Sequence, residues 1–270
     1  MASFDFDILR ATVLAIIQGL TEFLPVSSSA HLILPSELLG WADQGLAFDM
    51  ALHFGSLVAV LYYFRHDLWQ VANGVVRQMW RRQSSSESRL GWQLVLATVP
   101  AAVAGVLLED VVETQLRSVH VIIFTTLFYG VLLGIADRVP KQELGLSEMS
   151  WRTALVIGLA QMLAIIPGTS RSGITMTAAL FSNMNRADAA RFSFLLSIPT
   201  IGGAALLKLV ELLKTPGINW AELGYAVIVA SLTAYLCIRY FLKMVGRISF
   251  IPFVVYRIAL GLVLLVIFGF

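Results

Sequence analysis

Residues 18–34 read Gln-Gly-Leu-Thr-Glu-Phe-Leu-Pro-Val-Ser-Ser-Ser-Ala-His-Leu-Ile-Leu, and the interpretation of the whole sequence starts from them. A carboxylate, three hydroxyls and an imidazole stand here inside a strongly apolar segment. Gln18 and Glu22 are four residues apart, so they share one face of a helix, which Pro25 then interrupts. The serines at 27–29 stand where the next helix would begin. We expect a helix, a break and a second helix, with the polar groups gathered at the break.

The composition of the chain places this break in a membrane. Of 270 residues, 58% are hydrophobic and 13% are charged, and the mean hydropathy is +0.80. So little polar surface cannot cover a water-soluble protein of this size, so we expect an integral membrane protein surrounded by lipid. The net charge of +2 gives no reason to expect a nucleic-acid partner. A carboxylate at the centre of a bilayer costs about 3 kcal/mol to insert, which makes Glu22 a candidate functional residue.

Eight apolar segments follow one another, and two of them are interrupted. Six have the length of about 20 residues that a spanning helix needs. They are residues 46–64, 91–108, 119–136, 190–213, 223–242 and 251–270. Residues 8–39 and 153–182 are interrupted by Pro25 and by Pro167-Gly168. We expect these two segments to be re-entrant hairpins, because irregular backbone persists at membrane depth only where protein or a wet cavity surrounds it.

Basic residues in the connections predict the orientation. Residues 65–90 contain five arginines, and 239–249 contain three basic residues and no acid, so both should be cytoplasmic. Residues 109–118 and 214–222 carry little positive charge and should face outside, as should both termini. The serine-rich stretch 81–88 is expected to be a mobile connector.

The two halves of the chain, about 1–140 and 150–270, resemble each other. Three local matches are collinear: 19–22 with 158–161, 25–28 with 167–170, and 48–56 with 192–200. Each half is then one hairpin followed by three spans, and this odd number of crossings inverts the second copy relative to the first. We therefore expect one all-α membrane domain, 1–270, with an inverted-topology internal repeat whose two breaks meet near the midplane.

The second break, residues 167–175, predicts an anion site. Arg171 is surrounded by four hydroxyl residues: Thr169, Ser170, Ser172 and Thr175. A helix N-terminus binds anions through its free N–H groups, and an arginine adds a charged fork that fits phosphate. The alternative is close helix packing, with Arg171 reaching the membrane surface. We favour the anion site because Arg171 lies between two apolar arms.

The first break supplies reactive groups that the second lacks. One of the serines at 27–29 could act as a nucleophile, and His31 could move a proton. Glu22 together with Gln18 could hold a divalent metal or orient water. Phosphoryl transfer depends mostly on positioning and charge stabilisation, for which these groups suffice. Each residue alone has an ordinary structural explanation, but the combination on two facing breaks favours phosphoryl chemistry.

The two breaks, 18–31 and 167–175, closely resemble the signature motifs of the bacterial undecaprenyl-diphosphate phosphatase family, also known as the bacitracin-resistance proteins. The resemblance extends to chain length and to Phe-Gly-Ser at 54–56. It implies removal of the terminal phosphate of undecaprenyl diphosphate at the outer, periplasmic face of the bacterial inner membrane. This reaction regenerates the lipid carrier for peptidoglycan synthesis. The resemblance also implies a divalent cation, Mg²⁺ or Ca²⁺, as cofactor.

The resemblance implies roles by position. Glu22 corresponds to the essential acid, Ser28 to the proposed nucleophile, His31 to its acid–base partner and Arg171 to the diphosphate clamp. The substrate-binding candidates are Gln18, Ser27, Ser29, Thr169, Ser170, Ser172 and Thr175. Gln18 stands where many members have a second glutamate. The cation is therefore held either by Glu22 with an amide oxygen or mainly by the substrate's own phosphates.

Further polar residues lie inside the spans. Asp49 and His53 are one turn apart and should face inward, either supporting the hairpin residues or forming a buried bonded pair. Arg257, next to Tyr256, lies about two turns into the last span, and we expect it to extend to the cytoplasmic membrane surface.

A second function fits the same architecture. Inverted repeats with broken helices are typical of transporters, so a transporter or flippase for an anionic lipid or phosphate compound is the alternative. A transport site has no evident use for serine and histidine beside a glutamate, which favours the phosphatase. The sequence leaves homodimerisation open.

Overall fold

The computed structural model describes residues 7–42, 44–116, 118–139, 143–214 and 217–269, and these form helices with short connections and no β-strand. Six helices are long and apolar enough to cross a membrane. They are α3 (Gly45–Tyr63), α5 (Ser86–Leu107), α7 (Val119–Asp137), α10 (Arg186–Lys214), α11 (Trp220–Val245) and α12 (Ile251–Phe268). They coincide with the six predicted spans, so that prediction is confirmed.

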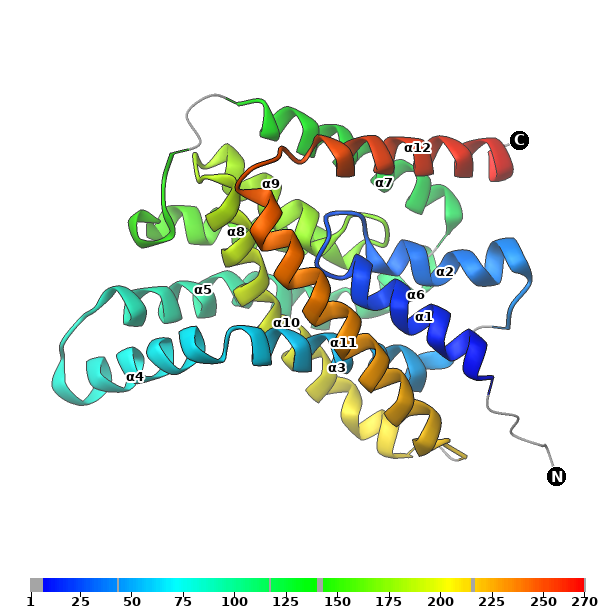
Figure 1. Cartoon of the computed structure of the whole chain (residues 1–270), viewed down its shortest axis with the longest axis horizontal. Coiled ribbons are helices and arrows are strands. Elements are labelled where there is room, and N and C mark those ends of the chain that lie inside the picture. The colour runs from blue at the N-terminus through cyan, green and yellow to red at the C-terminus, as the bar shows by residue number, and fades with distance from the viewer. Residues whose placement is uncertain (1–6, 43, 117, 140–142, 215–216, 270) are drawn as a thin grey trace.

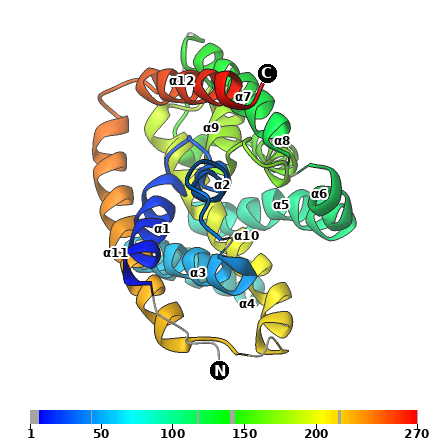
Figure 2. The same ribbon diagram turned by 90° about the vertical axis from the view of Figure 1, so that its right-hand side faces the viewer.

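The two interrupted segments are helix–break–helix elements, as predicted. The first consists of α1 (Ile8–Thr21) and α2 (Ser28–Leu39). The second consists of α8 (Trp151–Met162), extended by a short 3₁₀ turn, and α9 (Arg171–Phe181). Both breaks lie in the middle of the molecule, with α7 and α12 side by side along one face (Figures 1 and 2).

The connection expected over 65–90 is largely helical. Residues Arg65–Arg81 form α4, which packs against α5. The expected mobile connector at 81–88 is reduced to a short turn, because Ser85 and Ser88 cap each other's backbone and start α5 at once. An ion pair from Arg191 to Asp67 joins α4 to α10.

Each hairpin packs closely against a long helix from the other half of the chain. A Cβ on Gly19 of α1 would lie 2.7 Å from Thr233 Cβ on α11. A Cβ on Gly158 of α8 would lie 2.7 Å from the Ala97 backbone on α5. Only glycine permits these approaches, because any side chain would overlap the neighbouring helix. The packing holds both breaks at the centre.

The ends of the helices separate into two sides. In Figure 1 the turn between α4 and α5 lies at the left end of the molecule. The start of α1, the end of α12 and the short helix α6 (Glu109–Gln115) lie toward the right. The turn between α4 and α5, which was predicted to be cytoplasmic, and the start of the connection after α5, which was predicted to face outside, therefore lie on opposite sides.

Candidate active site at the two helix breaks

The two breaks have nearly the same backbone. Ser27 precedes α2 with φ 75° and ψ 97°, and Ser170 precedes α9 with φ 71° and ψ 111°. Ser27 Oγ lies 3.2 Å from Ser29 Oγ, and Ser170 Oγ lies 3.2 Å from Ser172 Oγ. Ser27 therefore matches Ser170 in structure.

This match corrects the alignment made from the sequence, which paired Ser28 with Ser170. The second break has one more residue between its proline and the helix cap, because Gly168 (φ 86°) adds a left-handed position that the first break lacks. With that residue counted, Ser28 matches Arg171. Each is the first residue of the helix that leaves its break.

The two breaks are in direct contact, as predicted. Ser172 Oγ donates a hydrogen bond to the Leu24 carbonyl oxygen at 2.8 Å. Arg171 Nη2 lies 3.1 Å from Glu22 Oε1, although the two residues are 149 positions apart. A guanidinium from one hairpin thus pairs with the carboxylate of the other.

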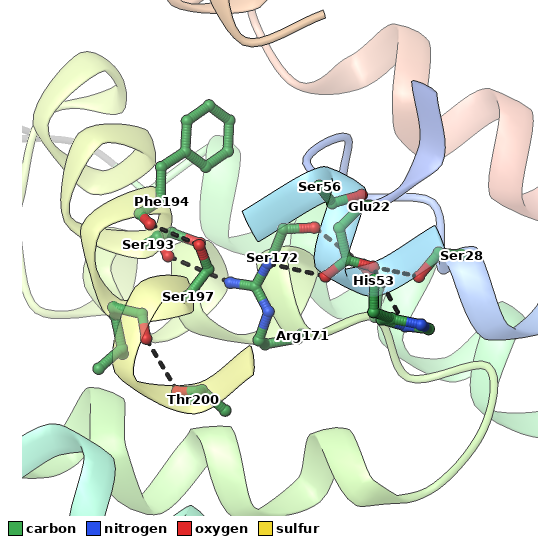
Figure 3. A network of polar contacts seen from close by, with 12 residues as sticks. Glu22, Ser28, His53, Ser56, Arg171, Ser172, Ser193, Phe194, Ser197 and Thr200 are labelled. Carbon is green, nitrogen blue, oxygen red and sulfur yellow. Dashed lines mark hydrogen bonds and ion pairs between the residues drawn. The ribbon is translucent and has the colours of Figure 1, made fainter. Parts of the chain in front are cut away.

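Glu22 is the centre of the polar network in Figure 3. Its Oε1 faces Arg171, while its Oε2 accepts hydrogen bonds from Ser28 Oγ at 2.7 Å and Gln18 Nε2 at 3.0 Å. His53 Nε2 approaches the same Oε2 at 3.7 Å. Glu22 is only 7% exposed, so these neighbours, rather than bulk water, set the chemistry of its carboxylate.

Two nitrogens of the Arg171 guanidinium have partners and the third does not. Its Nη1 donates to the Ser193 carbonyl oxygen at 3.1 Å, as Figure 3 shows. Ser193 is fixed in turn by Thr175, whose hydroxyl lies 2.7 Å from Ser193 Oγ. The Nε atom of Arg171 is buried without a hydrogen-bond partner. A buried donor without a partner costs free energy, so the site carries an unsatisfied positive group next to Glu22.

A cavity of about 770 Å³ opens at this network. Its polar lining consists mainly of Glu22, Ser27, Ser28, Ser29, Ser170, Arg171, Asp49 and His53, and most of its remaining wall is apolar and comes from α5 and α10. The other sequence candidates, Gln18, His31, Thr169, Ser172 and Thr175, are not among the lining residues. Asp49 and His53 face inward as expected, with His53 Nδ1 2.9 Å from the Asp49 carbonyl oxygen.

The hydrogen bonds of His31 join it to Ser27 and Tyr256 and not to Ser28. Its Nδ1 is 2.7 Å from the Ser27 carbonyl oxygen, and its Nε2 is 2.5 Å from Tyr256 Oη. The two rings are stacked with 5.6 Å between their centroids. Both nitrogens are thus engaged away from the Ser28 hydroxyl, which donates instead to Glu22.

Comparison with known proteins agrees with the two motifs. A family model described as bacitracin resistance protein BacA matches residues 11–263. The chain belongs to this family. It is 52% identical to an undecaprenyl-diphosphatase of Teredinibacter turnerae over 96% of this chain and 99% of the relative. It is 54% identical to an undecaprenyl-diphosphatase of Hahella chejuensis, over 96% and 97%, and 51% identical to undecaprenyl-diphosphatase 1 of Pseudoalteromonas translucida, over 96% and 98%.

The residues at the site do not form a preformed cage for a divalent cation. Among the described residues there is no group of three or more histidine, cysteine, aspartate or glutamate side chains that could hold a metal. Gln18 is fully buried, and its amide N–H donates to Glu22. Its Oε1 atom has no hydrogen-bond partner. Both Glu22 oxygens already accept hydrogen bonds.

Arg257 contradicts the expectation that it extends to the membrane surface. Its side chain is fully buried, and it donates to backbone carbonyls of both breaks and of α7. The sequence signal was present, because a charge two turns inside a span is by itself a functional indication. The sequence did not predict whether Arg257 faces lipid or the protein interior, because α12 is apolar on almost every side.

Proposed function

We propose that this protein removes the terminal phosphate of undecaprenyl diphosphate, as the printed names of its relatives indicate for them. One observation carries the proposal. The Ser28 hydroxyl and the Arg171 guanidinium come from two separate breaks and meet on the same carboxylate, Glu22, at a cavity with mostly apolar walls. A nucleophile, a base and an anion clamp beside an apolar channel match a prenyl diphosphate, which has a charged head and a hydrocarbon tail.

In the first step, Ser28 Oγ attacks the terminal phosphorus while its proton passes to Glu22. The bond between that phosphorus and the bridging oxygen breaks, and undecaprenyl phosphate leaves with the proton that Glu22 returns. Arg171 balances the charge on the terminal phosphoryl oxygens, and the N-terminus of α2 adds its dipole. We assign the base to Glu22 in place of His31, because the Ser28 hydroxyl already donates to Glu22 at 2.7 Å.

In the second step, water attacks the phosphorus of the phosphoserine and gives its proton to Glu22. The bond between phosphorus and Ser28 Oγ breaks, Glu22 returns the proton to Ser28 Oγ, and inorganic phosphate is released. If water instead attacks the substrate directly, Ser28 acts only as a hydrogen-bond donor to phosphate. A phosphoserine trapped in rapid quench distinguishes the two routes. The remaining hydroxyls at the cavity, on Ser27, Ser29 and Ser170, are proposed to bind the diphosphate oxygens.

We propose that a divalent cation, Mg²⁺ or Ca²⁺, would take most of its ligands from the diphosphate oxygens, and that Glu22 would be its protein ligand. No reaction step is assigned to it, since the donors present do not form a cage. The small number of carboxylates at the site supports this view, because a cation with few protein ligands needs oxygen ligands from its substrate or from water.

The proposed setting is the bacterial inner membrane, with the cavity open to the periplasm and the product returned to peptidoglycan synthesis. The cavity lining includes Val106 on α5 and Lys208 on α10, near the helix ends that adjoin the connections predicted to face outside, residues 109–118 and 214–222. The matched backbones at Ser27 and Ser170 support an inverted repeat. Cysteines placed at 27–31 and labelled with an impermeant outside reagent test the orientation, and labelling only from inside contradicts it.

The deciding experiment is phosphate release from a prenyl diphosphate by the purified protein in detergent. No compartments exist there, so a transporter or flippase for anionic lipids has nothing to transport, whereas a phosphatase turns over. Release that depends on Glu22 and Ser28 supports the proposal. A folded protein that binds prenyl diphosphate without releasing phosphate would favour the transporter.

A further inference from the structure

Arg257 on α12 uses every N–H of its guanidinium on a backbone carbonyl. Nε donates to Thr126 O at 3.2 Å. Nη1 donates to Pro25 O at 3.4 Å and Thr169 O at 3.0 Å. Nη2 donates to Thr125 O at 3.2 Å and Gly168 O at 2.8 Å. An arginine has five donors in one plane, and here all five are used.

The five carbonyls belong to three parts of the chain. Pro25 is in the first break, Gly168 and Thr169 are in the second, and Thr125 and Thr126 are on α7. Carbonyl groups in a helix break have lost their helical partners, and at membrane depth no bulk water replaces them. The Arg257 side chain therefore satisfies the carbonyl groups of Pro25, Gly168 and Thr169 and holds the two breaks together.

A second contact shows that each break is held at its proline. Thr125, the seventh residue of α7, donates its hydroxyl to Pro167 O at 2.7 Å. Arg257, the seventh residue of α12, donates to Pro25 O. The proline carbonyl of each break is thus bound from a helix of the other half of the chain.

Among the described residues, Arg257 forms no ion pair with a carboxylate. Arg171, in contrast, is paired with Glu22. A buried cation compensated only by carbonyl dipoles leaves a net positive charge directly behind both breaks. An anion bound in front of the breaks would be attracted by that charge, because screening is weak in a buried site.

We propose that Arg257 is a positioning residue for phosphoryl transfer: it locks the two breaks in register, so that Ser28 and Arg171 meet on Glu22, and it supplies background positive charge for the diphosphate. The inference rests on the proposed phosphatase function. The proposal assigns two separate effects to Arg257. Its five hydrogen bonds position the site and therefore affect kcat, and its positive charge attracts the diphosphate and therefore affects KM.

The first test measures kcat and KM for phosphate release from a short prenyl diphosphate in detergent. Arg257→Lys keeps the charge but has only three donors, so we expect kcat to fall at least about tenfold with KM within about threefold of wild type. Arg257→Met loses the charge as well, so we expect KM to rise about tenfold or more in addition. A purely structural role would lower the yield of folded protein and leave the KM of the folded fraction unchanged. Leu133→Ala, a fully buried change on α7, serves as that structural control.

A milder second test avoids variants that fail to fold. A Cβ on Gly130 of α7 would lie 3.1 Å from Arg257 Cβ, and a Cβ on Gly134 would lie 3.1 Å from Val254 Cγ1, one helical turn away. Gly130→Ala and Gly134→Ala thus change the same helix by the same methyl group against the same partner helix. We expect Gly130→Ala to lower kcat about threefold or more, and Gly134→Ala to remain near wild type.

The outcomes are distinguishable. If wild type releases no phosphate, the proposed function fails, and the inference about Arg257, which rests on it, falls with it. If wild type is active and Arg257→Lys matches its kcat, the inference is overturned. Equal activities of Gly130→Ala and Gly134→Ala overturn it as well, including when the Arg257 variants do not fold.

Discussion

The two breaks have almost the same backbone but different surroundings. Behind the second break, α9 is buried along nearly its whole length, from Ser172 to Leu180. Behind the first break, only Ala30, Leu32 and Pro35 of α2 are buried. The helix that leaves the second break is embedded in the core of the molecule, whereas the helix that leaves the first break lies nearer the surface.

This difference matches the groups that each break contributes. In the proposed mechanism, Arg171 at the start of the embedded helix α9 must keep a fixed direction to bind an anion, and packing around α9 provides that rigidity. Ser28, at the start of the less buried helix α2, would accept a phosphoryl group and then admit water, which requires access. In this proposal, the same backbone conformation holds a rigid anion clamp in one half of the chain and an accessible nucleophile in the other.

The largest expected effect comes from Glu22, the carboxylate that side chains of both breaks contact, and from its partner Ser28. Glu22→Gln and Ser28→Ala should each lower kcat by on the order of 10³, since each removes one member of a proton-transfer pair. Because the two groups act as a unit, the double variant should be little worse than either single variant. Phosphate release measures all three. Glu37→Gln, an exposed acid on the same hairpin, is the matched control. Losses that multiply in the double variant would break the proposed pairing.

The next effect tests the clamp on the second break. Arg171→Lys keeps the charge but cannot contact Glu22, Ser193 and a phosphate together, so we expect a loss of roughly 10² in kcat/KM. Arg191→Lys on α10 changes an arginine that is more exposed and pairs with Asp67, and it should stay near wild type. Near-normal turnover by Arg171→Lys would show that charge alone suffices at this position.

A smaller effect concerns how the first break is held. If His31 supports the Ser27 carbonyl, His31→Gln should retain activity within about tenfold, because an amide can donate the same hydrogen bond. His31→Ala should lose more, and Tyr256→Phe should resemble His31→Gln. Comparison of their kcat values decides. If His31 is instead the proton acceptor for Ser28, His31→Gln would be as inactive as Ser28→Ala.

The sequence predicted the elements better than the contacts between them. Apolar length located the six long helices, and Pro25 and Pro167 located the breaks, because helix interruption is a local property of proline. The collinear motifs predicted that the two breaks meet, but they did not predict that Arg171 pairs with Glu22. They also did not predict the hydrogen-bond partner of Ser28, because both Glu22 and His31 are close to it in sequence, and the structure shows that its hydroxyl donates to Glu22.

Two other features needed three-dimensional information. The alignment of the two breaks made from the sequence was shifted by one residue, because Gly168, with its positive φ, adds one position to the second break without changing the order of its residue types. Arg257 was assigned to the membrane surface, because a side chain of that length could extend either outward or inward from an apolar helix. Which way it extends depends on free carbonyl groups in distant segments, and hydrophobic periodicity does not report these.

The smallest expected effect compares the two serines at positive φ by stability alone. Both backbones are strained for a residue with a Cβ, and glycine relieves that strain at the expense of some unfolded-state entropy. Ser170 Oγ, however, accepts a hydrogen bond from the Gly173 N–H at 3.1 Å, whereas Ser27 makes no side-chain cap bond. Ser27→Gly should therefore raise the free energy of unfolding by about 1 kcal/mol, and Ser170→Gly should not, because it leaves a buried N–H unpaired at a cost of about 1–3 kcal/mol. Thermal unfolding in one detergent measures both. Equal shifts would mean that the cap bond contributes nothing and that the two breaks differ only in the groups they carry.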